Sequence, residues 1–342
     1  MRAMMLERLA PLREEPEPLK AAESPDPVPG PGEILIHVAA CGVCHTELDE
    51  IEGRMAPPRL PIVPGHQAVG RVEGLGPGAA GWRLGDRAGA AWIFSACGHC
   101  SFCRDGRENL CPEFRATGRD ADGGYADRLV MPAAFAIPIP DEIGDHEAAP
   151  LLCAGAIGWR SLRLSGYAPG KRLGLTGFGA SAHLVLRTAL AADPRAQVFV
   201  FARDEAQRRF AIELAAEWAG DTLDAPPQPL DAVIDTTPAW TPIVGALRAL
   251  APGGTLVINA IRKESADKEA LLRLDYASDL WMEKEIRSVA NVTRIDVNEF
   301  LSLAARTGLR PEVREYPLRD ANRALLDLRS GGFTGAPVLR TA

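Results

Sequence analysis

Residues 172–182 read RLGLTGFGASA, and this stretch decides how the middle of the chain folds. The short apolar run Leu173–Thr176 predicts a strand, and Ala180–Ala192 has the pattern of a helix. Between them, Gly177 permits a tight turn, Gly179 lets a pyrophosphate approach the backbone, and a small third residue lets helix and strand pack closely. A plain strand-to-helix turn is the alternative, but this context favours a dinucleotide site. Its expected contact residues are Gly177, Phe178, Gly179, Ala180 and Ala182.

Strands and helices alternate after this loop, which predicts an α/β domain with a doubly wound parallel sheet. The expected strands are Gln197–Phe201, Ala232–Asp235, Thr255–Ala260 and Ile286–Asn291. The expected helices are Asp204–Ala219, with Phe210, Leu214 and Trp218 on one face, and Thr241–Leu250.

The first half of the chain is rich in proline and glycine and predicts an irregular β domain. We expect a strand at Ile34–Ala40, a strand pair within Leu60–Gly76 and further strand structure at Arg83–Ala91. A chain of 342 residues is long for one core. We therefore expect three segments, in which the last folds back on the first: 1–153, 154–294 and 295–342.

Composition narrows the class of protein. The net charge of -7 and the pI near 5.5 give no basic footprint for nucleic acid. The most apolar stretch, Ala148–Trp159, is too short and too rich in glycine to span a bilayer. We see no apolar leader at the start, and the seven cysteines suit a reducing compartment. We expect a cytoplasmic protein that binds neither nucleic acid nor membrane.

A cluster of cysteines follows the spacing C-x2-C-x2-C-x7-C. Four thiolates on one short lobe suit a closed tetrahedral zinc site. Two disulfides are the alternative, although Cys41, Cys44 and Cys153 would then leave an odd thiol. The expected ligands of this structural zinc are Cys97, Cys100, Cys103 and Cys111.

The second strand of the α/β unit bears on the choice of dinucleotide. NAD sites usually place an acid at the end of this strand to hold the ribose hydroxyls. Here Phe201 or Ala202 fills that position, and Arg203 follows. Arg203 could pair with the 2′-phosphate of NADP, whereas in the alternative Asp204 supplies the acid. We expect a preference for NADP over NAD.

The chain resembles the zinc-dependent medium-chain alcohol dehydrogenases over nearly its full length. The resemblance implies a GroES-like β catalytic domain with a Rossmann cofactor domain, two zinc ions, NAD(P), an alcohol or carbonyl substrate and a homodimer or homotetramer. It also implies a catalytic zinc bound by Cys44, His66 and Cys153, with one position open. The motifs, in the family's order, are PGPGEILIHVAACGVCHTEL, PGHQAVGRV, GDRAG, the cysteine lobe, GGYADRL, PLLCAG and GLTGFGASAH.

The same resemblance implies roles for neighbouring residues. Thr46 matches the hydroxyl that accepts the alcohol proton, and Glu47 matches the acid behind the histidine ligand. His45 matches a contact to the cofactor pyrophosphate. Trp92 matches an aromatic wall of the substrate pocket, although a core tryptophan is the alternative.

The chain departs from the family pattern at three places. The family usually has the motif Gly-His-Glu, and here Gln67 replaces the glutamate, which removes a negative charge near the metal. Asp49 lies where many relatives have a histidine that passes the proton outward, so Asp49 or water would carry it. Gly335–Pro337 lacks the usual arginine for the pyrophosphate. Two other functions stay open: a polyol or amino-alcohol dehydrogenase, and a non-catalytic, zinc-stabilised nucleotide-binding protein.

Overall fold

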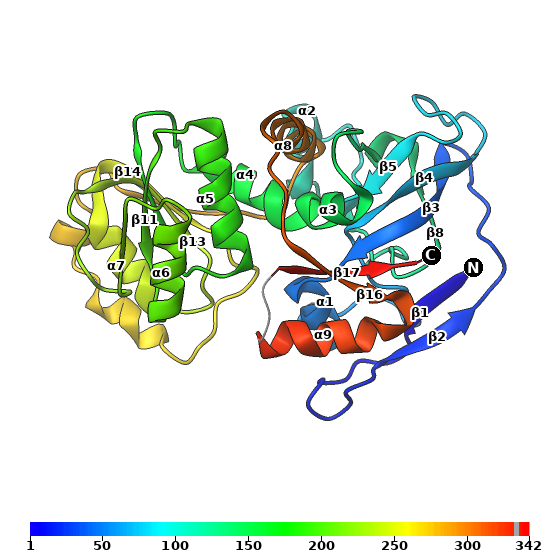
Figure 1. The fold of residues 1–342 in the computed structure, drawn as a ribbon, viewed down its shortest axis with the longest axis horizontal. Coiled ribbons are helices and arrows are strands. Elements are labelled where there is room, and N and C mark those ends of the chain that lie inside the picture. The colour runs from blue at the N-terminus through cyan, green and yellow to red at the C-terminus, as the bar shows by residue number, and fades with distance from the viewer. Residues whose placement is uncertain (332–334, 342) are drawn as a thin grey trace. The chain divides into compact units, whose positions relative to one another are not determined.

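The protein is described by a computed structural model that covers residues 1–331 and 335–341. Its backbone contacts divide the chain into two compact units (Figure 1). Unit 1 comprises Met1–Ala156 and Asn291–Ala342, and unit 2 comprises Ile157–Ala290.

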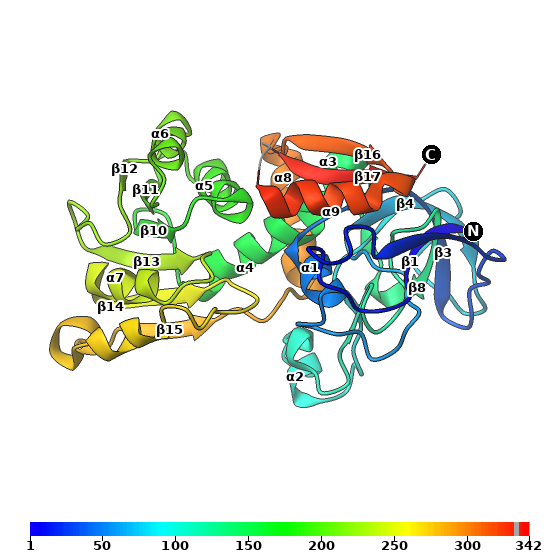
Figure 2. The same cartoon turned by 90° about the horizontal axis from the view of Figure 1, so that it is seen from below.

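A six-stranded parallel sheet forms the centre of unit 2, which carries the green-to-orange colours in Figure 2. The strand order is β12-β11-β10-β13-β14-β15. The chain starts in the middle at β10, builds one side and then crosses to β13 on the other, which is the expected doubly wound topology. The strands are β10 (Arg172–Thr176), β11 (Gln197–Phe201), β12 (Trp218–Gly220), β13 (Leu230–Asp235), β14 (Leu250–Ile258) and β15 (Glu285–Ser288).

Apolar cores cover both faces of this sheet, because successive side chains of a strand point to opposite faces. Val198 and Val200 of β11 pack with Val185 of α5, whereas Phe199 and Phe201 belong to the core around α7. The helices are α4 (Ala156–Leu164), α5 (Ala180–Ala192), α6 (Glu205–Glu213), α7 (Thr241–Ala249), η4 (Lys268–Arg273) and η5 (Tyr276–Leu280).

Unit 1 is built on a seven-stranded sheet with the order β16-β17-β3-β4-β5-β9, in which β8 also pairs with β3. All its pairs are antiparallel except β16 with β17. The strands are β3 (Glu33–Gly42), β4 (Ala68–Leu75), β5 (Arg87–Ala90), β8 (Arg128–Pro132), β9 (Ile137–Pro138), β16 (Val313–Pro317) and β17 (Ala336–Arg340). Two small sheets pair β1 (Arg2–Leu6) with β2 (Leu19–Glu23), and β6 (Ile93–Ser95) with β7 (Arg115–Ala116).

Short helices fill the connections of unit 1. The C-terminal segment returns to its sheet, because β17 pairs with β3. The helices are α1 (His45–Ile51), α2 (Ser101–Arg104), η1 (Glu108–Leu110), η2 (Ala133–Phe135), α3 (Asp145–Pro150), η3 (Leu151–Gly155), α8 (Arg294–Thr307), η6 (Leu318–Asp320) and α9 (Ala321–Ser330). Within the described residues, no helix combines the length and apolar character that crossing a membrane demands.

The expected fold class is confirmed, but two local predictions are wrong. Helix α6 ends at Glu213 because the chain turns at Ala215, whose φ is +66°. Trp218 therefore lies in β12 and packs on Phe201, on the opposite face of the sheet from Leu214. Within Leu60–Gly76 only β4 is a strand, because the prolines before it cannot donate ladder hydrogen bonds.

Candidate active site

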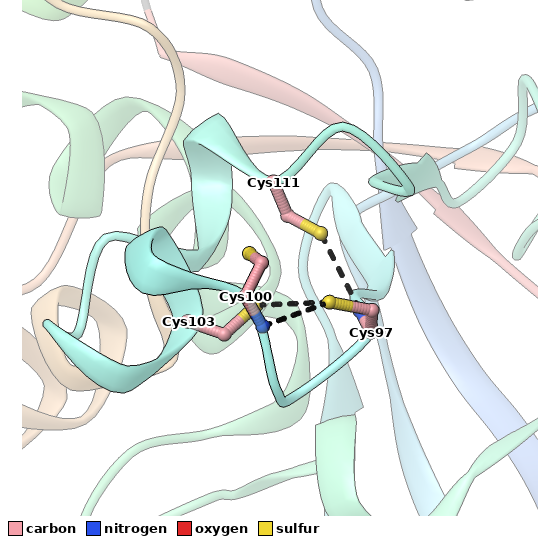
Figure 3. Close-up of side chains that lie close together, drawn as sticks. All are labelled: Cys97, Cys100, Cys103 and Cys111. Carbon is pink, nitrogen blue, oxygen red and sulfur yellow. Dashed lines mark hydrogen bonds between the residues drawn. The ribbon is translucent and has the colours of Figure 1, made fainter.

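The cysteine lobe of unit 1 brings four thiols together (Figure 3). Its segment runs from the loop after β6 through α2 to the residue after η1, and the four sulfur atoms all lie within 4.8 Å of one another. The Sγ atoms of Cys97 and Cys103 are 3.9 Å apart, and all seven cysteines of the chain are free thiols. Four soft donors at this spacing fit a closed tetrahedral zinc site.

Backbone donors already favour a thiolate at one of these positions. The N–H of Cys100 donates to the Sγ of Cys97 at 3.4 Å. A backbone hydrogen bond from His99, the largest cause, and this one from Cys100 lower the pKa of Cys97 to about 6. Burial raises the pKa of Cys103 to about 12 beside the other sulfurs. Because a metal binds the thiolate form, a cation bound in the lobe would have to offset the raised pKa of Cys103.

A second cluster gathers Cys44, His66 and Cys153, whose donor atoms also lie within 4.8 Å of one another. The Sγ of Cys44 is 3.7 Å from the Nε2 of His66. Cys44 is the N-cap of α1, where the N–H of Thr46 donates to its sulfur at 3.3 Å. Cys153 lies in η3, a π-helical turn, a feature frequent at functional sites. Three donors leave a tetrahedral metal one open position.

The position of His66 depends on the residue before it. Gly65 has a φ of +99°, and a Cβ there would lie 2.3 Å from the ring of buried Tyr125. Only glycine therefore fits this turn, which follows Pro64 and leads the chain into His66. Gln67 is buried beside His66, with its side-chain oxygen packed against Gly42.

A carboxylate lies behind the histidine. The Oε1 of Glu47 is 2.6 Å from the Nδ1 of His66, and both side chains are buried. Burial lowers the pKa of His66, but the charges of Glu47 and Cys44 outweigh it, so the pKa rises well above the usual value. A carboxylate at this position favours the tautomer with the proton on Nδ1, which leaves Nε2, 3.7 Å from the sulfur of Cys44, for a metal.

The other sequence-predicted residues of this site lie in α1 or contact the ring of His66. Thr46 is half-buried and His45 is exposed in the first turn of α1. Asp49 is buried, with its carboxylate 2.5 Å from the Nε of Arg54. The ring of Trp92 meets that of His66 edge-on, with the centroids 6.4 Å apart.

Sequence reasoning missed Glu50. Its side chain is buried, and one oxygen accepts from the Nε1 of Trp92 at 3.4 Å. Burial and the charge of Glu47 raise the pKa of Glu50 to about 8. The available signal was helical spacing, because Glu50 follows Thr46 by four residues and so lies on the same face of α1.

The nucleotide loop of unit 2 has the expected glycine geometry. Gly177 has a φ of +77°, and a Cβ there would come within 2.8 Å of Thr237. A Cβ at Gly179 would meet no described atom within 4 Å, so its backbone is open to a ligand. Phe178 and Ala182 are buried instead and hold the loop to the core. Ala180 begins α5, but its side chain lies outside the described residues.

The end of β11 presents cationic groups. Ala202 is buried and Arg203 is exposed. The carboxylate of Asp204 accepts from the N–H of Ala206 at 2.7 Å and so caps α6. Arg208 donates to the carbonyl oxygens of Ala202 and Arg203, which keeps a second guanidinium at this turn.

Comparison with known proteins agrees with both units. The alcohol dehydrogenase GroES-like domain family matches residues 30–141. A probable alcohol dehydrogenase, AdhA, of Mycobacterium tuberculosis is 45% identical over 327 residues, which is 94% of this chain and 92% of that protein.

Solved structures share the whole fold. An NAD-dependent alcohol dehydrogenase is 25% identical, with a TM-score of 0.85 over 100% of both chains. A cobalt- and zinc-bound alcohol dehydrogenase from Pyrobaculum aerophilum is 26% identical, with a TM-score of 0.85 over 100% of this chain and 99% of that one. This chain therefore belongs to the zinc-dependent medium-chain alcohol dehydrogenase family, whose members are oxidoreductases that act on alcohols.

Proposed function

We propose that this chain catalyses reversible hydride transfer between NAD(P) and a primary or secondary alcohol, giving an aldehyde or ketone. One observation carries the proposal: Cys44, His66 and Cys153, remote in sequence, place their donor atoms within 4.8 Å of one another, with Thr46 next to the first. A nucleotide-binding protein without turnover needs neither the three-donor set nor the hydroxyl.

The donor atoms fit zinc at both clusters, so we propose two zinc ions per chain. Two thiolates and one imidazole match catalytic zinc sites, and the four thiolates of the lobe match structural ones. Glu47 supplies the carboxylate that orients the imidazole. In this proposal unit 1 is the catalytic domain and unit 2 the cofactor domain.

The residues of the chain would divide the work as follows. Bound zinc would supply Lewis acidity, and a bound nicotinamide cofactor would supply the hydride acceptor. The hydroxyl of Thr46 accepts the proton of the substrate alcohol and can donate its own hydrogen to the next acceptor. We propose Asp49 as the next acceptor and Trp92 as a wall for the substrate. His45, exposed at the start of α1, would contact the pyrophosphate.

Asp49 is already engaged by another side chain. Its carboxylate lies 2.5 Å from the Nε of Arg54, so it can take part in this proposed path only by giving up part of that ion pair. Replacing Asp49 by asparagine should therefore lower kcat by less than about tenfold, whereas loss of an effective general base costs about a hundredfold or more.

Zinc-replete enzyme, mixed with NADP or NAD and a panel of primary, secondary and aromatic alcohols, tests the activity. We expect alcohol-dependent growth of reduced-nicotinamide absorbance, fastest for one class. If no alcohol of the panel gives reduced nicotinamide, in protein shown to carry two zinc ions, the proposal is overturned and a binding protein is favoured.

We further propose a preference for NADP. The position expected to hold an acid is Ala202, which has no carboxylate. The carboxylate of Asp204 caps a helix, and Arg203 is exposed beside Arg208. Replacing Arg203 by alanine should lower kcat/KM for NADP by about tenfold, the worth of one charge-assisted contact, and leave NAD unchanged. Arg209, exposed but paired with Glu205 at 2.6 Å, is the matched control. A wild-type enzyme that prefers NAD would refute this.

An exposed sheet edge supports a homodimer or homotetramer. All four residues of β15 are exposed, and in the described part of the chain β15 pairs with β14 alone. An unpaired edge strand is a template for a second copy. Sedimentation should give more than one subunit, and Ile286→Lys should reduce the number. The free thiols lead us to place the protein in the cytoplasm.

A further inference from the structure

A buried ion pair of unit 2 has no part in the function proposed so far. Asp235, the last residue of β13, is fully buried, and its Oδ2 lies 2.5 Å from the Nζ of Lys263. Lys263 follows β14 by five residues, and its side chain is only 9% exposed. Lysine is rarely buried to this extent unless paired, so the pair has a definite task in the fold.

All the donor capacity of Lys263 is used within the protein. Its ammonium group donates to Asp235 and to the carbonyl oxygens of Thr237 at 2.9 Å and Ala239 at 2.8 Å. An ammonium group has three hydrogens, so none is left for a ligand. Lys263 therefore cannot bind a phosphate and instead fixes the turn at residues 236–239.

Asp235 connects this turn to the nucleotide loop. Its Oδ1 accepts from the hydroxyl of Thr176 at 2.6 Å and from the hydroxyl of Thr237 at 2.8 Å. Thr176 ends β10 and directly precedes Gly177, at which a Cβ would come within 2.8 Å of Thr237. The carboxylate thus joins the carboxyl ends of β10 and β13, between which the chain reverses its direction of winding. Ligands of doubly wound sheets bind at that point.

We propose that Asp235 and Lys263 are positioning residues for dinucleotide binding. They hold the 236–239 turn against Gly177 and so fix the loop in the shape that a pyrophosphate requires. The proposal rests on the proposed dinucleotide site and adds the residues that preorganise it. The proposal predicts that changes to this pair weaken dinucleotide binding by more than their effect on protein stability explains.

Two variants separate positioning from stability. Lys263→Met leaves the buried carboxylate of Asp235 without its cation, so it should lower both the thermal midpoint and the affinity for dinucleotide. The double variant D235N/K263M removes both charges and should recover much of the midpoint. Without the ammonium group the turn stays loose, so the Kd for NADP and for NAD should remain about tenfold above wild type, the cost of ordering it on binding.

Lys284 offers a matched control. It is half-buried in the same unit and donates to the carbonyl oxygens of Leu247 and Ser278, at 2.8 and 3.0 Å. It precedes β15 and so lies at the amino edge of the sheet, away from the nucleotide loop. Lys284→Met should lower the thermal midpoint and leave the Kd unchanged.

Kd is measured by calorimetry with NADP and with NAD, and the midpoint by circular dichroism, on the zinc-replete full chain. Weak binding by D235N/K263M at a recovered midpoint supports the proposal. Recovery of Kd in parallel with the midpoint, or wild-type Kd in Lys263→Met, overturns it and leaves the proposed function intact. A wild-type chain that binds neither dinucleotide overturns both.

Discussion

The cysteine lobe and the Cys44–His66–Cys153 cluster reach similar donor sets by opposite routes. The lobe takes all its sulfurs from one segment of fifteen residues, Cys97 to Cys111, so local turns suffice to assemble it. The second cluster takes one donor from the start of α1, one from the turn after Gly65 and one from η3, so it exists only when unit 1 is folded. A local set of four can close around a metal and brace the fold. A dispersed set of three depends on the fold and leaves a position for chemistry.

The largest effect should follow from breaking the dispersed cluster. Replacing Cys153 by serine should reduce the zinc content from two ions to one and alcohol oxidation by about a thousandfold, because a Lewis acid supplies several kcal/mol of barrier reduction. The thermal midpoint should stay close to wild type, since η3 remains packed. Metal analysis, kinetics and calorimetry on one preparation check all three. Retained activity with a single zinc would remove the cluster from catalysis.

Breaking the lobe should give the reverse pattern. Cys103→Ser should lower the free energy of unfolding by about 4 kcal/mol, as losses of structural metals do. For units of this size that corresponds to a fall in midpoint of roughly 10 °C. The second cluster should keep its zinc, and turnover per remaining catalytic zinc should change little below the midpoint. If the variant has lost the zinc of the lobe and is as stable as wild type, the lobe does not stabilise the fold.

The hydroxyl of Thr46, two residues after Cys44, further distinguishes the second cluster from the lobe. Thr46→Val should lower kcat by about a hundredfold, the usual worth of a positioned proton acceptor. Zinc content should stay at two ions per chain, and Thr46→Ser should restore most of the rate. If the valine variant turns over like wild type, the alcohol proton leaves by another route.

The smallest effect concerns how the lobe is attached to the rest of unit 1. Arg294 at the start of α8 donates to both carboxylate oxygens of Glu108 in the lobe, at 2.9 and 2.7 Å. Burial alone would raise the pKa of Glu108, but the bonds from Arg294 outweigh it and lower the pKa. A folded-state pKa below the unfolded value contributes stability above the unfolded pKa of about 4.3, and this is lost as the pH falls through the folded value.

Replacing Arg294 by methionine tests that attachment. Arg294 is 37% exposed, so solvent screening limits the loss in unfolding free energy near neutral pH to about 1 kcal/mol. The difference between wild type and variant should shrink as the pH falls below about 4.3, to the part that the bond from Arg294 to the carbonyl oxygen of Ala134 contributes. Denaturant titrations at several pH values give the two curves. A difference that stays constant with pH would exclude the carboxylate as its source.

Sequence was informative where a motif is local. The strand, glycines and helix at 172–192 were predicted because each step depends on neighbouring residues, and α5 and β11 have the predicted bounds. The convergence of Cys44, His66 and Cys153 came from resemblance to a family, because nothing in the spacing of three such distant residues predicts their contact.

The remaining features depend on tertiary structure. Trp218 fits a helical pattern, yet the turn at Ala215 sends it into β12 against Phe201. The Asp235–Lys263 pair joins residues on either side of β14, and no local rule connects an acid that ends one strand with a lysine beyond the next. Helical spacing places Glu50 on the same face of α1 as Thr46, but its burial beside Trp92 depends on the loop before β6 and could not be predicted from that spacing.

Anomalous X-ray diffraction from crystals of the protein, recorded on both sides of the zinc absorption edge, tests the central claim most directly. We predict two peaks per chain: one enclosed by the four sulfurs of the lobe, and one bonded to the sulfurs of Cys44 and Cys153 and the Nε2 of His66. A single peak in the lobe, with those three residues apart in zinc-replete protein, would contradict the account.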